Sequence, residues 1–302
     1  MYWQEDELSR RLSGKVIVIT GGTAGVGKEE ILKLAQHNPA HIYFTGRNVQ
    51  AVNSLIDEVN AITTSTTTTN DGKSILTFIP CDQTSLSSVQ RTGQKQRRGR
   101  IVVTSTPGFR GAPEIGFAGL KKMQGGVGGP AMLAKNTLYS QNKLANVLHA
   151  AELARRYPEL PVAASHPGVI ASTELMGHMN FIDRLVVKLA VRNFESYSLQ
   201  EGVYNTLWAA MTTTTTQATG TAGQEGASLE SGGLCEAVGK PLAHTKLSVD
   251  EALAGNGRRR KLNDNLKMQL PQFPKHVSVS LEGGDGDGGL ITIYLAGSVS
   301  IL

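Results

Sequence analysis

The segment from Lys15 to Lys28, which reads KVIVITGGTAGVGK, constrains the fold of this 302-residue chain more than any other. It starts with the apolar, mostly β-branched run Val16–Ile19, which favours a buried strand. Glycines follow at positions 21, 22, 25 and 27, after which the pattern becomes helical. Glycine lets the backbone come close to a phosphate, and free amides at a helix N-terminus favour its negative charge. The segment therefore predicts a phosphate cradle; the competing interpretation is a glycine-rich turn that binds nothing.

Strands and helices alternate through most of the chain. The hydrophobic pattern predicts strands at 15–20, 41–45, 74–80, 100–104 and 162–165, and helices at 26–36, 49–62, 85–96, 137–157 and 199–211. This alternation is typical of α/β proteins with a Rossmann-like, doubly wound parallel sheet. We assign residues 12–254 to one such domain, with threonine-rich loops near 63–70 and 212–221 and a glycine-rich loop at 107–130. Residues 255–302 follow no strand–helix pattern and are predicted to form an irregular tail.

The composition, with 40% hydrophobic and 18% charged residues, is that of a globular protein. The net charge of +5 comes partly from arginine runs at 97–100 and 258–260. We expect these runs to be solvated surface, because no nucleic-acid-binding module accompanies them. The two cysteines have no metal-type spacing, and no signal peptide or membrane-spanning run is visible, which favours the cytoplasm. The amphipathic stretch 181–194 could associate with a membrane surface, but packing on the protein body is the favoured interpretation.

Tyr139 and Lys143 lie four residues apart in the helix predicted at 137–157 and therefore share one face. A phenol ordinarily titrates near pH 10. A lysine ammonium one turn away favours the phenolate, which would make the tyrosine a usable acid or base at neutral pH. Taken alone, the pair is better explained as an ordinary surface tyrosine and lysine, because such pairs four residues apart are common.

Several motifs together carry a resemblance. They are TGGTAGVG at 20–27, Cys81-Asp82, YSQNK at 139–143, HPG at 166–168, QEGVYNTLWAA at 200–210 and VGKPLAHTKLSVDEALA at 238–254. On these residues the chain resembles the short-chain dehydrogenase/reductase family, in the style of its retinol-dehydrogenase-like and WW-domain-oxidoreductase-like branch. The resemblance covers roughly residues 12–254 and implies a Rossmann-like fold with a nicotinamide cofactor.

The resemblance also implies a role for each matched position. The glycine turn would bind the pyrophosphate and Asp82 would contact the adenine. Tyr139 would exchange a proton with the substrate oxygen, while Lys143 would lower the pKa of Tyr139 and bind the nicotinamide ribose. The implied cofactor contacts are Gly21, Thr23, Gly25, Val26, Gly27, Arg47, Asp82, Lys143, Pro167, Gly168, Val169 and Thr173, with Ser172 as the alternative to Thr173.

The end of the second predicted strand bears on the choice of nucleotide. A carboxylate at this place normally binds the ribose 2′-hydroxyl of NAD, whereas an arginine accommodates the 2′-phosphate of NADP. The turn here reads Gly46-Arg47-Asn48 and contains no acid. We therefore expect NADP(H), with a small alcohol or carbonyl compound as the partner and no metal.

The family places a substrate-polarising serine after the strand at 100–104. That position falls on Thr106 in this chain, which keeps a hydroxyl but adds a methyl group. Ser105 precedes it and could serve only if the register shifted by one, which would turn its side chain to the other face of the strand.

A larger departure lies between Asp82 and Arg100. Only 17 residues separate them, enough for one crossover between parallel strands but too few for two crossovers and a strand between them. The family has such a strand next to the first one, ending in an Asn-Asn-Ala-Gly-type motif. Its absence predicts a sheet that lacks one central strand, with either an unpaired first strand or an inward shift of the strand at 100–104.

Three hypotheses about function follow. The first is an NADP(H)-dependent oxidoreductase that interconverts an alcohol and a ketone or aldehyde, with Tyr139 as acid/base. The second is a nucleotide-binding relic or sensor without catalysis, suggested by the missing segment and by Thr106. The third is a chain that does not fold stably.

Overall fold

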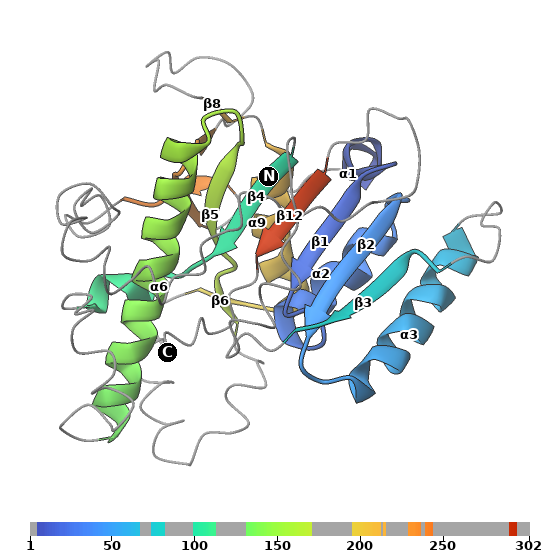
Figure 1. Cartoon of the computed structure of the whole chain (residues 1–302), viewed down its shortest axis with the longest axis horizontal. Coiled ribbons are helices and arrows are strands. Elements are labelled where there is room, and N and C mark those ends of the chain that lie inside the picture. The colour runs from blue at the N-terminus through green and yellow to red at the C-terminus, as the bar shows by residue number, and fades with distance from the viewer. Residues whose placement is uncertain are drawn as a thin grey trace.

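The computed structural model describes residues 5–66, 74–81, 99–112, 131–170, 195–212, 214–215, 229–236, 239–243 and 290–294. Its centre is an eight-stranded sheet with the strand order β11-β10-β5-β4-β12-β1-β2-β3 (Figure 1). The strands are β1 (Val16–Thr20), β2 (His41–Gly46), β3 (Leu76–Pro80), β4 (Gly99–Thr104), β5 (Val162–His166), β10 (Leu234–Glu236), β11 (Lys240–Pro241) and β12 (Leu290–Tyr294). All neighbours are parallel except β10 and β11.

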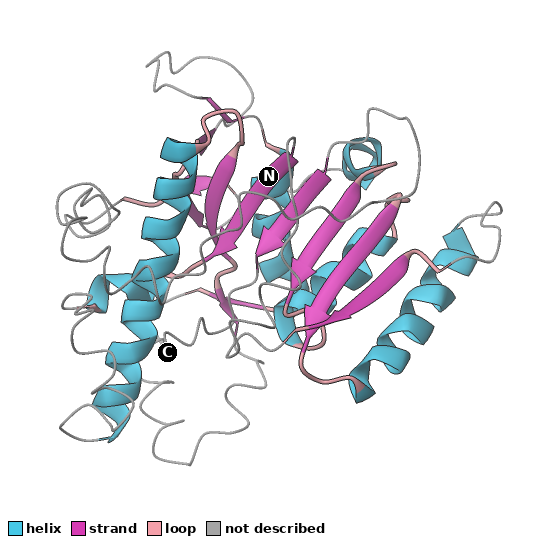
Figure 2. Cartoon of the chain, in the orientation of Figure 1, coloured by secondary structure: helices cyan, strands magenta, loops and turns pink. Residues whose placement is uncertain are grey.

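Helices cover both faces of the sheet (Figure 2). They are α1 (Glu5–Leu12), α2 (Gly25–Ala35), α3 (Gln50–Thr66), the 3₁₀ helix η1 (Pro107–Gly111), α6 (Ala131–Arg156) and α9 (Leu199–Met211). Two short strand pairs lie outside the sheet: β6 (Val169–Ile170) with β7 (Ser196–Tyr197), and β8 (Thr214–Thr215) with β9 (Leu229–Glu230). The predicted Rossmann-like, doubly wound α/β fold is confirmed.

Alternating side chains of the strands build two apolar layers, as period-2 strands require. On one face Ile17, Ile19 and Val102 are fully buried and belong to a cluster with α2, α3 and α9. On the other face Ile101 and Val103 belong to a second cluster with η1 and α6. The two layers hold the carboxyl ends of β1, β4 and β5 in fixed relation to α2 and α6, the helices that carry the glycine turn and the Tyr139 motif.

The strand β12 occupies the place between β1 and β4, and it comes from the C-terminal end of the chain. It runs parallel to both, with Thr292 opposite Val18 of β1 and Ile101 of β4. The expectation of a sheet without this central strand is therefore wrong, and Leu290–Tyr294, within the predicted irregular tail, form a strand. The apolar run LITIY supplies the strand at this place, and it pairs with the edges of both β1 and β4.

Because β12 occupies this place, β4 has not moved inward. It lies two positions from β1, with β12 between them. Tyr294, the last residue of β12, lies opposite Thr20 at the end of β1. The point where the strand order reverses direction is thus between β1 and β12. In open α/β sheets, ligands bind at the carboxyl ends of the strands at such a point.

Other differences from the predicted elements are local. The helix α3 extends to Thr66, into the predicted threonine-rich loop, and α6 begins at Ala131 rather than 137. The helix α1 was not predicted. Arg100, expected in solvated surface, is half-buried, and its guanidinium donates to the Ala209 carbonyl at 3.0 Å. The predictions for 85–96, 181–194 and most of 107–130 lie outside the described residues.

Within the described ranges, no helix is both long and apolar enough to cross a membrane. In the same part of the chain, no three His, Cys, Asp or Glu side chains gather as a metal site would require. Cys81 and Cys235 are buried free thiols.

Candidate active site

The glycine-rich turn forms at the carboxyl end of β1. Gly21 (φ +76°) and Gly25 (φ +56°) adopt left-handed backbone conformations that favour glycine. The Gly22 amide donates to the Thr45 carbonyl at 2.8 Å, which ties the turn to β2. A Cβ atom at Gly22 would lie only 2.9 Å from the Cβ of Phe44, whereas one at Gly25 would meet no atom within 4 Å. Gly22 thus serves close packing, and Gly25 faces open space.

The helix α2 begins at Gly25 without a side-chain cap. Its N-cap residue, Ala24, makes no side-chain hydrogen bond, and the first turn contains no acidic residue. The amides of this turn and the positive end of the helix dipole are therefore suited to an anion. Together with the open space at Gly25, this turn fits the pyrophosphate of a dinucleotide. The other predicted contacts of the turn are Thr23, which packs against Gly46, and Val26 and Gly27, which lie in the first turn of α2.

Arg47 lies at the same edge of the sheet, directly after β2, and is exposed. The next residue, Asn48, precedes α3 and caps its start. Its Oδ1 accepts hydrogen bonds from the amides of Gln50 and Ala51 at 3.1 and 3.3 Å. Asn48 is therefore committed to helix capping. Arg47 is left as the charged side chain of this turn, where an acid would stand in a site built for NAD.

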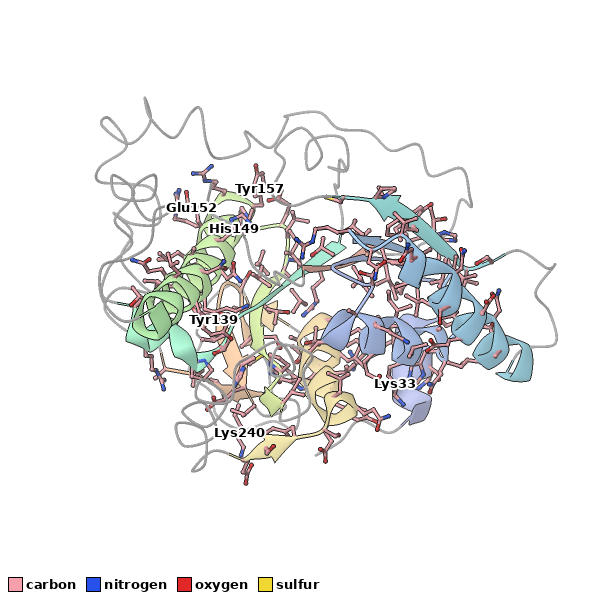
Figure 3. The ribbon with its side chains drawn as sticks, turned by 90° about the horizontal axis from the view of Figure 1, so that it is seen from below. Lys33, Tyr139, His149, Glu152, Tyr157 and Lys240 are labelled. Carbon is pink, nitrogen blue, oxygen red and sulfur yellow. The ribbon has the colours of Figure 1, made fainter. Side chains whose placement is uncertain are left out.

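Tyr139 lies on α6 beside η1, as seen when the sheet is viewed from the carboxyl ends of its strands (Figure 3). Its side chain is 45% exposed. A Cβ atom at Gly108 would lie 3.1 Å from the Thr106 Oγ1 and 3.3 Å from the Tyr139 ring, so the two side chains are neighbours, and the Thr106 hydroxyl acts to lower the pKa of Tyr139. The Thr106 oxygen itself accepts from the Gly108 amide at 2.9 Å, which leaves its hydroxyl proton available to a second partner. The structure thus brings Tyr139 and Thr106 together.

Ser105 has a different environment. It is fully buried, and its hydroxyl donates to the Lys143 carbonyl at 2.9 Å. One turn further along α6, the Asn146 amide donates to the Thr104 carbonyl at 2.9 Å. These two hydrogen bonds fix α6 on the end of β4. Ser105 therefore positions the helix, and Thr106 presents the hydroxyl at the Tyr139 phenol.

The Lys143 ammonium lies 5.7 Å from the centre of the Tyr139 ring. The two residues share a face of α6, as predicted. Burial lowers the pKa of Lys143 to about 8. Desolvation raises the pKa of Tyr139, and the neighbouring Thr106 hydroxyl offsets this only in part. The net shift of the Tyr139 pKa is thus upward, because loss of solvation is the largest cause.

The segment after β5 would line the nicotinamide side. Gly168 (φ +88°) turns the chain away from β5, and a Cβ atom there would lie 2.4 Å from the Tyr197 ring. The Asn205 amide of α9 donates to the His166 carbonyl at 2.7 Å and to the Ser165 hydroxyl at 3.1 Å. Pro167, Gly168 and Val169 are therefore held against α9 by packing and by a buried amide.

His166 itself is buried at the end of β5. Burial lowers its pKa to about 4, and the Lys143 charge acts in the same direction, so the ring is neutral at neutral pH. Asn205 also donates to the Cys235 carbonyl at 3.2 Å and accepts from the Gly239 amide at 3.2 Å. Sequence reasoning missed Asn205 and Asn146 as positioning residues; the one available signal was an asparagine on an otherwise apolar helix face. Asp82, Ser172 and Thr173 lie outside the described residues.

The sheet and its carboxyl edge define a Rossmann-like α/β protein with a dinucleotide-type turn. No protein-family model matches the chain. Over 85 residues the chain is 34% identical to the 3-ketodihydrosphingosine reductase of Dictyostelium discoideum, a match that covers 27% of this chain and 25% of that protein. The match thus spans about a quarter of the length of that curated relative.

Two solved structures extend the comparison. A dehydrogenase/reductase from Sinorhizobium meliloti 1021 aligns with a TM-score of 0.47 and 14% identity over 69% of this chain and 92% of that chain. A double mutant of a Serratia marcescens short-chain dehydrogenase/reductase aligns with a TM-score of 0.46 and 14% identity over 67% and 92%. One stretch of the chain is thus similar to a 3-ketodihydrosphingosine reductase, and the chain also aligns with two solved dehydrogenase/reductase structures.

Proposed function

We propose that this chain is an NADP(H)-dependent oxidoreductase that interconverts an alcohol and a ketone or aldehyde, with Tyr139 as the acid/base. The observation that carries the proposal is the position of Tyr139, whose ring centre lies 5.7 Å from the Lys143 ammonium and whose ring flanks Gly108 together with the Thr106 hydroxyl. These groups lie at the edge of the sheet where the glycine turn opens α2. The arrangement joins a proton-transfer group to a dinucleotide cradle.

Each residue has a distinct task in this proposal. The cofactor supplies or accepts the hydride when it is bound. In the direction of reduction, Tyr139 donates its phenolic proton to the carbonyl oxygen of the substrate, and the resulting phenolate is stabilised by Lys143 and by the Thr106 hydroxyl. Thr106 can alternatively donate its hydroxyl proton to the substrate oxygen, while its own oxygen accepts from the Gly108 amide.

The preference for NADP(H) is supported by Arg47, exposed after β2 with no acidic residue in its turn. The guanidinium would pair with the 2′-phosphate. Gly21, Gly25 and the first turn of α2 would bind the pyrophosphate. Lys143 would also bind the nicotinamide ribose, and the segment from Pro167 to Thr173 would line the nicotinamide.

The test is to incubate the purified chain with NADPH and a panel of aldehydes and ketones and to follow NADPH absorbance. Tyr139→Phe is expected to lower kcat by about 10²–10⁴-fold while leaving NADPH affinity unchanged. Tyr157→Phe is the matched control, because Tyr157 is similarly exposed, at 42%, but lies past the other end of α6 (Figure 3). Absence of turnover in a folded protein, or full activity in Tyr139→Phe, would overturn the proposal.

The raised pKa of Tyr139 favours a second candidate, a nucleotide-binding protein that does not catalyse the reaction. A phenol that holds its proton more tightly is a weaker general base near neutral pH. This candidate predicts saturable NADPH binding with no turnover on any carbonyl compound. It also predicts that Tyr139→Phe changes no measurable property of the protein.

A further inference from the structure

The gap between β1 and β4 is filled by a segment that is remote from both strands in sequence. The chain leaves the sheet at β11, on its outer edge, and re-enters as β12, with the three strands β10, β5 and β4 between them. Residues 244–289 connect the two places. A central strand is normally delivered by a short crossover from a neighbouring strand. Here every other strand of the sheet precedes this central strand in the sequence.

Both walls of the gap are strand edges that need a partner. The five residues of β12 pair with Val16–Thr20 on one side and with Gly99–Val103 on the other. Without β12, the backbone amides and carbonyls of two buried strands would face each other across an empty position. Unpaired buried backbone groups are strongly unfavourable, so the gap has a strong preference for a strand.

The register also selects what kind of strand fits. Ile291 and Ile293 stand opposite Ile17 and Ile19, whose side chains are fully buried against α2 and α9. Successive residues of a strand alternate between faces, so every second position of the incoming strand must be apolar on this side. The sequence LITIY satisfies this pattern.

We propose that the gap between β1 and β4 is a strand-acceptor site that can take the C-terminal strand of a second copy of this chain. The sheet holds β12 by backbone pairing in a defined register, and an identical strand from another copy makes the same pairs. Fully extended, a connection of this length reaches on the order of 150 Å, well beyond one domain. Exchange of an identical element between copies is a low-cost route to a dimer.

Full-length variants test first whether the fold needs a strand in the gap, and then whether a strand from another molecule can occupy it. Thr292→Pro places a proline in the middle of β12, where it removes an amide and cannot pair within a central strand. Thr292→Val is the matched control, because it keeps a β-branched residue suited to a strand. We expect Thr292→Pro, but not Thr292→Val, to lose the cooperative thermal unfolding transition.

The binding experiment adds a fluorescent synthetic peptide of residues 287–299 to each protein. Anisotropy should rise saturably with Thr292→Pro and restore its cooperative transition, while wild-type protein, whose gap is filled, should bind at least tenfold more weakly. A peptide that itself carries Thr292→Pro should not bind. Equal binding by the two peptides, equal binding by the two proteins, or no restored transition would overturn the proposal.

The second-copy occupant is tested by mixing two full-length chains. Thr292→Pro retains an intact gap, whereas Val18→Pro damages the gap in β1 but retains an intact β12. We expect the mixture to regain a cooperative transition and to show a heterodimer by native mass spectrometry. A mixture that behaves as the sum of its two components would refute strand exchange between copies.

Discussion

Glu30 is a carboxylic acid buried completely between α2 and α9. Its burial predicts how the stability of the protein changes with pH. Its side chain has no exposed surface, and burial raises its pKa from 4.5 to about 8; the nearby Thr206 hydroxyl opposes this only weakly. Glu30 is therefore protonated in the folded protein at neutral pH. In the unfolded chain it is ionised above its ordinary pKa.

The direction in which stability changes with pH follows from proton binding by Glu30. Between pH 4.5 and about 8 the folded state carries one proton at Glu30 that the unfolded state lacks, so stability falls as pH rises. The slope is about 1.4 kcal/mol per pH unit, and at neutral pH the accumulated loss is on the order of 3 kcal/mol. The contribution is fully present below pH 4.5 and is lost as the pH rises through about 8.

Glu30→Gln removes the titration while keeping the size of the side chain. Urea unfolding can be followed by circular dichroism at several pH values between 5 and 8. With each pH unit, the free energy of unfolding of the variant should rise by about 1.4 kcal/mol relative to that of wild type. Glu29→Gln, at the adjacent half-buried position, is the control for loss of a charge alone. Stability curves that run parallel for Glu30→Gln and wild type would refute the reasoning.

Three further predictions concern the site. Thr106→Val should lower kcat about tenfold or more because the hydroxyl beside Tyr139 is lost, while Thr106→Ser should retain most activity. Steady-state kinetics with NADPH measures kcat for both variants. Asn205→Ala should lower the free energy of unfolding by on the order of 3 kcal/mol, since the side chain loses contacts with four hydrogen-bond partners, three of them buried, and urea denaturation measures this. Activity that needs the Lys143 ammonium should fall as the pH rises through about 8, and Lys143→Arg should remove that fall from the pH–rate profile.

Features that depend on neighbouring residues could be predicted from the sequence. The glycine turn follows from glycines placed between an apolar run and a helical pattern, and the structure places it at the carboxyl end of β1. The shared face of Tyr139 and Lys143 follows from their spacing on one helix. The alternation of strands and helices was sufficient to predict the doubly wound sheet.

Features that depend on distant pairing could not be predicted. Nothing within Leu290–Tyr294 marks β1 and β4 as its partners, because strand pairing leaves only an apolar pattern in the sequence. The glycine-rich stretch before it favoured the interpretation as a loose tail. The hydrogen bonds of Asn205 likewise join β5, β10 and the residues before β11, which come together only in the folded sheet.

The measurement that tests the account most directly is calorimetric titration of the full-length chain with NADPH and with NADH. The glycine turn, the uncapped start of α2 and Arg47 predict saturable binding of one NADPH per chain and tighter binding of NADPH than of NADH. Arg47→Ala should remove that preference without abolishing binding. Absence of NADPH binding to a cooperatively folded protein, or tighter binding of NADH, would contradict the account.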